Sequence, residues 1–302
     1  MIEHAFGGSW TEQKLQRVKL YLSSYLCALK NQRFTKIYID AFAGTGYRSN
    51  PDSACEVKLP FDDEELNEIA AFRDGSAKIA LQFDPGFDKY IFIEKVMKKC
   101  DELEKLRLEY PQKADAIEII RSDANTALTD ICCEDTDWGN KRVVIFLDPY
   151  GLQVDWNTLR CIARINGIDL WYLFPIGAVL RLLPKKREVC RENSDKLDVI
   201  FGTHEWYDAF YKERSFTGLF DDNNSDILRE ANVISVTDLI VKRLESIFSK
   251  VSRKPAVLRN TKKNSPMFLL CFAMTNSSRK AIDLAMRLAD YVLEDRNVKN
   301  NY

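Results

Sequence analysis

The chain has 302 residues, of which 46% are hydrophobic and 29% charged, a composition typical of a globular protein with a sizeable core. Its 44 basic and 45 acidic residues nearly cancel, which excludes a global field that would draw it to polyanions. No run of 18 apolar residues occurs and the first residues contain no apolar signal core, so we expect no membrane association and a cytoplasmic location.

The eight cysteines are scattered, form no C-x-x-C pair and are accompanied by only two histidines. A disulfide framework belongs to shorter, secreted chains, and a zinc site needs ligands at close spacing. We therefore expect reduced thiols and no metal.

The elements predicted along the chain begin with an amphipathic helix over residues 10–30, where apolar residues recur at helical spacing. Seven short apolar segments rich in Ile, Val, Phe and Tyr follow it. They are "IYIDAFAG", "KYIFIEK", "IEIIRSDA", "RVVIFLDPYG", "IDLWYLFP", "PAVLRN" and "MFLLCFAMTN". Helical or polar stretches separate the first five, and a last helix is predicted over 278–294.

Continuous apolar strands that alternate with helices predict an α/β fold, a doubly wound and mostly parallel seven-stranded sheet covered on both faces. A long charged stretch interrupts the pattern at residues 177–251, and we interpret it as a helical insertion. The sheet domain then comprises residues 1–176 and 252–302. A polar segment at about 48–82 is expected to be a second insertion.

Acids end the first four predicted strands, namely Asp40, Glu94, Asp123 and Asp148. Ligands of doubly wound sheets bind outside the carboxyl ends of the strands, so four successive acids there predict a ligand site.

The segment that follows Asp40 consists mostly of small residues and contains two glycines. Its residues are Phe42, Ala43, Gly44, Thr45 and Gly46. Such a turn lets a ligand approach the backbone and the next helix N-terminus. Ser49 stands where a dinucleotide fingerprint needs its third glycine, and no Gly-Lys-Ser/Thr follows, so neither a dehydrogenase motif nor a P-loop is present.

Two of these acids have a specific expected role. Glu94 is placed to accept both hydroxyls of a ribose, and Asp123, with the backbone N–H of neighbours such as Ala124, to recognise an adenine amine. The alternative for each is a helix N-cap.

The segment "DAFAGTG" resembles the first motif of class I S-adenosylmethionine-dependent methyltransferases, and Glu94 and Asp123 fall where that family holds ribose and adenine. The resemblance implies a Rossmann-like methyltransferase sheet and S-adenosylmethionine as cofactor. Asp40 and Glu94 are 54 residues apart, whereas about 20 is usual in such units, so the segment 48–82 is additional.

The end of the fourth strand, "VVIFLDPYG", is similar to the Asp/Asn-Pro-Pro-aromatic motif of enzymes that methylate exocyclic amines of nucleobases. The Asp148 carboxylate and the Pro149 carbonyl can accept the two N–H bonds of such an amine and turn its lone pair towards the methyl group. Tyr150 directly follows the proline and Gly151 takes the aromatic position, which resembles transfer-RNA guanine-N2 methyltransferases. The alternative is a plain strand-ending turn.

Blocks along nearly the whole chain resemble the three-Cys-motif partner family: "GGSWTEQKLQRVKLYLSSYL", "YIDAFAGTG", "GSAKIALQ", "FDKYIFIE", "FLDPYGLQVDW" and "FLLCFAMTNSS". The resemblance implies a partner protein bearing three cysteines, suggestive of a radical S-adenosylmethionine enzyme. Trp10 and Lys14 match the family's N-terminal Trp-x-x-x-Lys, and are expected to close over the methionine end of the cofactor. The alternative is an aromatic residue capping the core beside an exposed lysine.

Two basic clusters are candidate substrate-binding segments. Lys185 and Lys186 lie in the first, and Arg253, Lys254, Lys262 and Lys263 in the second. The alternative is solvated surface.

From these residues we expect an S-adenosylmethionine-dependent methyltransferase acting on an exocyclic amine of a nucleobase in RNA or DNA. A methyltransferase-fold partner subunit and a methyltransferase of small molecules or proteins stay open as alternatives. Salt-sensitive nucleic-acid binding is expected of a nucleobase methyltransferase and not of a methyltransferase of small molecules or proteins.

Overall fold

The central sheet organises the molecule, which is described by a computed structural model over residues 10–45, 75–134, 137–184, 189–215, 225–260 and 263–294. In this part of the chain the sheet has eight strands in the order β3-β2-β1-β4-β5-β10-β8, with β9 also paired to β10. Their bounds are β1 Thr35–Asp40, β2 Lys89–Glu94, β3 Ile117–Arg121, β4 Lys141–Leu147, β5 Ile168–Phe174, β8 Lys250–Val251, β9 Ala256–Arg259 and β10 Pro266–Met274. Strands β1 to β5 are mutually parallel, and β10 is antiparallel to β5.

The doubly wound α/β prediction is confirmed, with one strand more than expected. Two strands take the place of the single strand predicted at this edge of the sheet. β9 pairs with the first half of β10, and β8 pairs with Ala273 and Met274 near its end. The order reverses between β1 and β4, and such switch points are where doubly wound sheets bind ligands.

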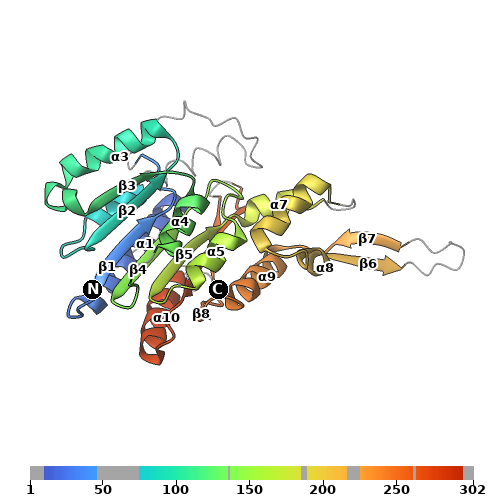
Figure 1. Cartoon of the computed structure of the whole chain (residues 1–302). Helices are drawn as coiled ribbons and strands as arrows, with labels where there is room; N and C mark the ends of the chain where they lie inside the picture. The colour runs from blue at the N-terminus through green and yellow to red at the C-terminus, as the bar shows by residue number, and fades with distance from the viewer. Residues whose placement is uncertain are drawn as a thin grey trace, which may run out of the picture.

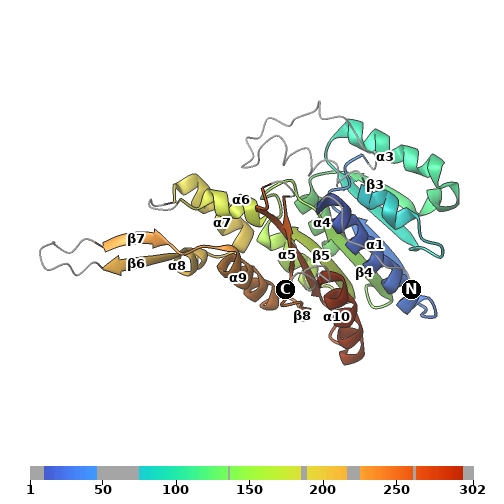
Figure 2. The same cartoon turned by 180° about the vertical axis from the view of Figure 1, so that it is seen from behind.

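Helices cover both faces of the sheet (Figures 1 and 2). One face packs against α4 (Ala124–Cys133), α5 (Trp156–Ala163) and the inserted helices. The other packs against α1 (Trp10–Leu29), a helix at 75–81, α3 (Met97–Glu109) and α10 (Arg279–Leu293). The strands bury side chains on both faces because successive residues alternate, so that Ile37 and Ile39 face one layer and Tyr38 the other.

Two short elements flank the strands: a 3-10 turn, η1 (Pro111–Ala116), precedes β3, and α6 (Ile176–Leu182) follows β5. No helix in the described residues is long and apolar enough to cross a bilayer.

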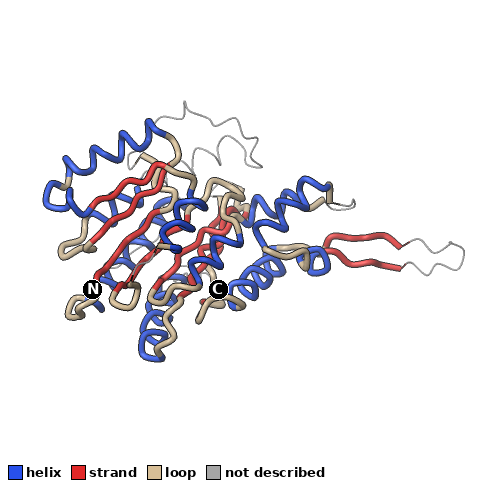
Figure 3. The backbone as a smooth tube through the Cα atoms, viewed as in Figure 1, coloured by secondary structure: helices blue, strands red, loops and turns tan. Residues whose placement is uncertain are grey.

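The segment 177–251 is only partly helical, which corrects the prediction of a helical insertion. It contains α7 (Arg191–Phe201), α8 (Trp206–Phe210) and α9 (Val233–Glu245), but also a hairpin of β6 (Tyr211–Ser215) and β7 (Ser225–Arg229). The hairpin projects from the body of the molecule as an arm (Figure 3). Its base is fixed by the Arg229 guanidinium, which donates to the carbonyls of Leu180 and Leu183 at 3.0 and 2.7 Å.

Gly202 ends α7 in the left-handed region, at φ 64°. A Cβ there would lie 2.0 Å from Cδ1 of Trp156, the first residue of α5. We expect Gly202→Ala to lower the free energy of unfolding by about 2 kcal/mol, because it adds both backbone strain and overpacking. Urea unfolding measures this. Gly139→Ala, at a position without positive φ, is the control, and an equal loss in both variants would contradict the expectation.

Candidate functional site at the carboxyl edge of the sheet

The four predicted acids lie along one edge of the sheet. Asp40 and Glu94 are the last residues of β1 and β2, and Asp148 directly follows β4. These three are buried, with at most 4% of their surface exposed, whereas Asp123, two residues beyond β3, is exposed. Asp40 and Asp148 therefore flank the switch point between β1 and β4.

The turn after β1 is held by its own acid. Asp40 accepts the Phe42 backbone N–H at 3.2 Å and the Ser76 hydroxyl at 2.6 Å. Phe42, Ala43 and Thr45 are buried, and Gly46 lies outside the described residues. Ser76, from the helix at 75–81, was not predicted, because a serine 36 positions away carries no signal that it contacts Asp40.

Glu94 joins the ends of β1 and β2. Its carboxylate accepts the Gly44 N–H at 3.1 Å and the Val96 N–H at 2.9 Å. Gly44 has φ 65°, a conformation that glycine adopts without steric cost. These two bonds fix the carboxylate at the carboxyl end of β2, beside the turn at Gly44.

Asp123 serves as the N-cap of α4, which is the alternative that the sequence left open. It accepts the N–H groups of Asn125 at 3.0 Å and Thr126 at 3.5 Å, and Ala124 is buried as the first helical residue. The Lys95 ammonium lies 4.0 Å from its other oxygen. A cap and a ligand contact are compatible, because the carboxylate remains exposed.

Asp148 has a buried cation beside it. The Lys14 Nζ lies 4.0 Å from Asp148 Oδ1, and both side chains are about 1% exposed. The same Nζ lies 4.8 Å from the centre of the Phe268 ring. Lys14 was expected to close over the methionine end of a cofactor; the structure places it next to the predicted catalytic acid. The Trp10 side chain lies outside the described residues.

The turn after Asp148 is compact. Gly151, at φ 84°, donates its N–H to the Pro149 carbonyl at 3.1 Å, and the Tyr150 N–H donates to Gln153 Oε1 at 2.9 Å. A carbonyl has two lone pairs, so Pro149 keeps capacity for a second donor. Tyr150 is half-buried against the core.

Asn125 is a positioning residue that the sequence did not predict. Its amide nitrogen donates to the Gln153 carbonyl at 2.7 Å, and its oxygen accepts from the Asp155 N–H at 3.0 Å and the Thr158 hydroxyl at 2.8 Å. The start of α4 thus fixes the loop that follows Asp148. Asn within a first helical turn gives no sequence signal for such a role.

The predicted basic clusters are divided in space. Lys185, Lys186 and Lys262 lie outside the described residues. Lys263 lies in the β9–β10 turn, on the same edge as Asp148, since β10 begins where β5 ends. Arg253 and Lys254 lie between β8 and β9, away from that edge, and Arg253 pairs with Glu245 at 2.6 Å.

The strand order, the single antiparallel strand beside β5 and the helices on both faces define an α/β, Rossmann-like methyltransferase fold. No protein-family model matches the chain, and no curated protein matches it. Among solved structures it is similar to protein LPL1258 from Legionella pneumophila, at 11% identity and TM-score 0.46, over 95% of this chain and 94% of that one.

Two other structures are similar at the same sequence identity and lower TM-scores. One is spermidine synthase from Thermotoga maritima, at 11% identity and TM-score 0.39, over 97% of this chain and 65% of that one. The other is magnesium protoporphyrin IX methyltransferase from Synechocystis, solved with S-adenosylhomocysteine, at 11% identity and TM-score 0.36, over 87% and 84%. Similarities this distant do not identify a reaction.

Proposed function

We propose that this chain is an S-adenosylmethionine-dependent methyltransferase that methylates an exocyclic amine of a nucleobase in RNA or DNA. The observation that carries the proposal is Asp148, a buried acid with a cation 4.0 Å away, at the carboxyl end of β4 beside the glycine turn of β1. Burying a carboxylate is costly unless a partner compensates it, and this one lies at the switch point where ligands bind.

The residues at this edge fit the cofactor. Glu94 would accept the ribose hydroxyls, Asp123 at the exposed rim would contact the adenine, and the turn at Gly44 would bring backbone close to the ligand. When bound, S-adenosylmethionine supplies an electrophilic methyl group on a sulfonium.

The chain's own contribution is orientation of the amine. Asp148 would accept one N–H and the Pro149 carbonyl the other, which would aim the nitrogen lone pair at the methyl group, and Asp148 would take the proton that the methylated amine loses. The Lys14 ammonium balances the negative charge of Asp148 in the buried site. Asn125 holds the loop 149–155 through Gln153 and Asp155, and so keeps the Pro149 carbonyl in place. Lys263, on the same edge, would contact a phosphate of the polynucleotide.

The first test is calorimetric titration with S-adenosylhomocysteine, using NAD as the control ligand. We expect saturable binding of S-adenosylhomocysteine only, weakened about tenfold or more in Glu94→Gln, because a charge-assisted hydrogen bond contributes about 1.5–3 kcal/mol. Glu118→Gln, a partly exposed acid paired with Lys89 on the neighbouring strand, is the matched control and should bind as wild type does.

Failure of the folded protein to bind S-adenosylhomocysteine would overturn the stand-alone enzyme. Binding restored by an added three-cysteine partner would instead support the partner-subunit role that the family resemblance implies. Salt-sensitive binding of RNA or DNA tests the substrate class separately.

A further inference from the structure

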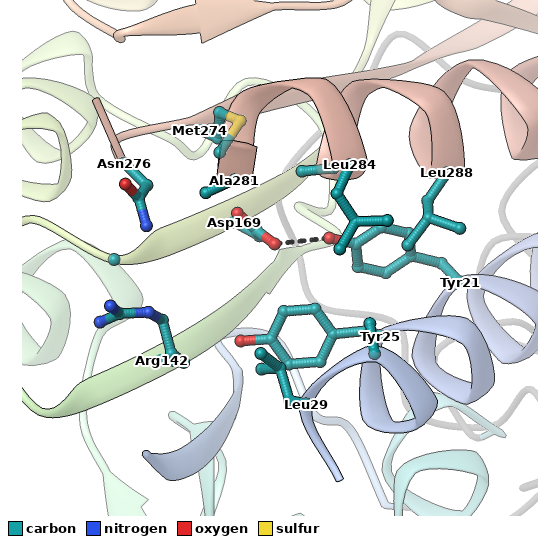
Figure 4. Close-up of a pocket in the computed structure, with 13 residues that line it drawn as sticks. Tyr21, Tyr25, Leu29, Arg142, Asp169, Met274, Asn276, Ala281, Leu284 and Leu288 are labelled. Carbon is teal, nitrogen blue, oxygen red and sulfur yellow. Dashed lines mark hydrogen bonds between the residues drawn. The ribbon is translucent and has the colours of Figure 1, made fainter. Parts of the chain in front are cut away.

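A second pocket lies at the opposite edge of the sheet, between α1 and α10 (Figure 4). It is bounded by the beginning of β5 at Asp169 and the end of β10 at Met274. Its walls are mostly apolar, formed by Leu29, Leu284, Leu288 and three alanines. The cavity measures about 80 Å³ and reaches the surface beside Leu284, which is 39% exposed.

Polar groups converge on the inner end of this pocket. Tyr21 donates its hydroxyl to Asp169 Oδ2 at 2.6 Å, and both residues are buried. Tyr25 is 6% exposed, and its hydroxyl makes no hydrogen bond with the described residues. Figure 4 shows that hydroxyl pointing into the space between Arg142 and Asp169. Asn276 lines the same end.

Burying the Asp169 carboxylate costs folding free energy, which a purely structural role would not offset. Burial is the main cause that raises the pKa of this carboxyl from 3.8 to about 6, with the Tyr21 hydrogen bond and the Arg142 charge opposing it. An apolar residue of similar volume would usually give an equal or more stable core. A titratable group perturbed in this way inside a pocket indicates a binding site.

Hydrogen-bonding capacity defines which ligand fits. A carboxylate has no proton to donate to Asp169, and an ammonium has no lone pair with which to accept from Tyr25. A neutral hydroxyl meets both requirements, because it donates to Asp169 while it accepts from Tyr25. At about 80 Å³ the cavity is smaller than the roughly 150 Å³ that holds benzene in an engineered cavity, so at most one ring fits, with part of it at the open mouth beside Leu284.

We propose that this pocket binds a small, uncharged, mainly apolar molecule with a hydroxyl head group, of the phenol class. The site is separate from the methyl-transfer site and does not depend on the function proposed for it. Helix α1 contributes residues to both sites: Lys14 lies beside Asp148 at the methyl-transfer site, and Tyr21 and Tyr25 line this pocket.

The probe is phenol, with benzoate, benzylamine and toluene as matched ligands, followed by NMR titration of the full chain. We expect saturable phenol binding, with cross-peaks between its ring protons and the methyl groups of Leu284 and Leu288. Benzoate and benzylamine should bind at least tenfold more weakly, because neither a carboxylate nor an ammonium can both donate to Asp169 and accept from Tyr25.

Tyr25→Phe should weaken phenol binding about tenfold and leave the thermal midpoint unchanged, because it removes a hydroxyl that bonds to none of the described residues. Tyr291→Phe, an exposed tyrosine on α10 that does not line the pocket, should leave the affinity unaltered. Phenol binding without the leucine cross-peaks, equal affinity in Tyr25→Phe, equal affinity for benzoate, or no saturable binding would each overturn the proposal.

Discussion

Asp148→Asn is expected to slow methyl transfer to a polynucleotide by about 10²- to 10³-fold, the range seen when a preorganised polar group is removed from an active site. The asparagine retains the shape, but its neutral amide accepts the substrate N–H more weakly and can present an NH₂ group that opposes it. Affinity for S-adenosylhomocysteine should stay within about twofold, because Glu94 and the β1 turn carry that contact in the proposed mechanism. Single-turnover transfer of labelled methyl to RNA and to DNA measures the rate.

The control for this variant is Asp238→Asn, an exposed acid on α9, which should transfer methyl at the wild-type rate. The role assigned to Asp148 is wrong if its variant retains full activity, or if lost activity follows entirely from lost cofactor affinity. Thermal unfolding of both variants separates either result from misfolding.

Asp169 should make the protein less stable as the pH rises from about 4 to 7. Burial raises the pKa of its carboxyl from the ordinary value of 3.8 to about 6 in the folded state, so the folded protein binds the proton more tightly than the unfolded chain. The resulting stabilisation is complete below pH 3.8 and is lost as the pH passes through 6. The shift corresponds to about 3 kcal/mol at 1.36 kcal/mol for each pH unit.

Asp169→Asn should remove this dependence, since a neutral amide oxygen can still accept the Tyr21 hydrogen bond. The variant is expected to match wild type near pH 4 and to exceed it by up to about 3 kcal/mol at pH 7. Urea unfolding at four pH values measures the difference, with Asp238→Asn as the reference for an exposed acid. A constant difference between wild type and variant across this range would show that the carboxyl titrates normally in the folded state.

The positions of the acids along the sheet edge could be predicted from the sequence, because a parallel strand that ends in an acid brings that acid to the same edge as its neighbours. The contacts that these acids make could not be predicted. The pairing of Lys14 with Asp148 joins residues 134 positions apart, and only the docking of α1 against β10 brings them together.

Other features were missed for related physical reasons. The strands of the β6–β7 hairpin, "YKERS" and "SDILR", carry charges and no apolar alternation, so they have no signal of burial. Asp169 was overlooked because it stands at the start of an otherwise apolar strand, where a polar residue normally faces solvent. We propose sites at both edges of the sheet, but the rule that ligands bind at strand ends applies only to the carboxyl edge.

The contact between the first and last helices also constrains synthesis. Arg17, on α1, donates to the carbonyls of Val292 and Leu293 at the end of α10 at 2.6 and 3.0 Å, and β10 separates β5 from β8 and β9. A nascent chain that has exposed only β1 to β5 therefore lacks both β10, the second neighbour of β5, and the acceptors for Arg17. The domain cannot complete its sheet until β10 has left the ribosome, nor seat α1 until the end of α10 has done so, and until then the apolar faces of β5 and α1 need protection from aggregation.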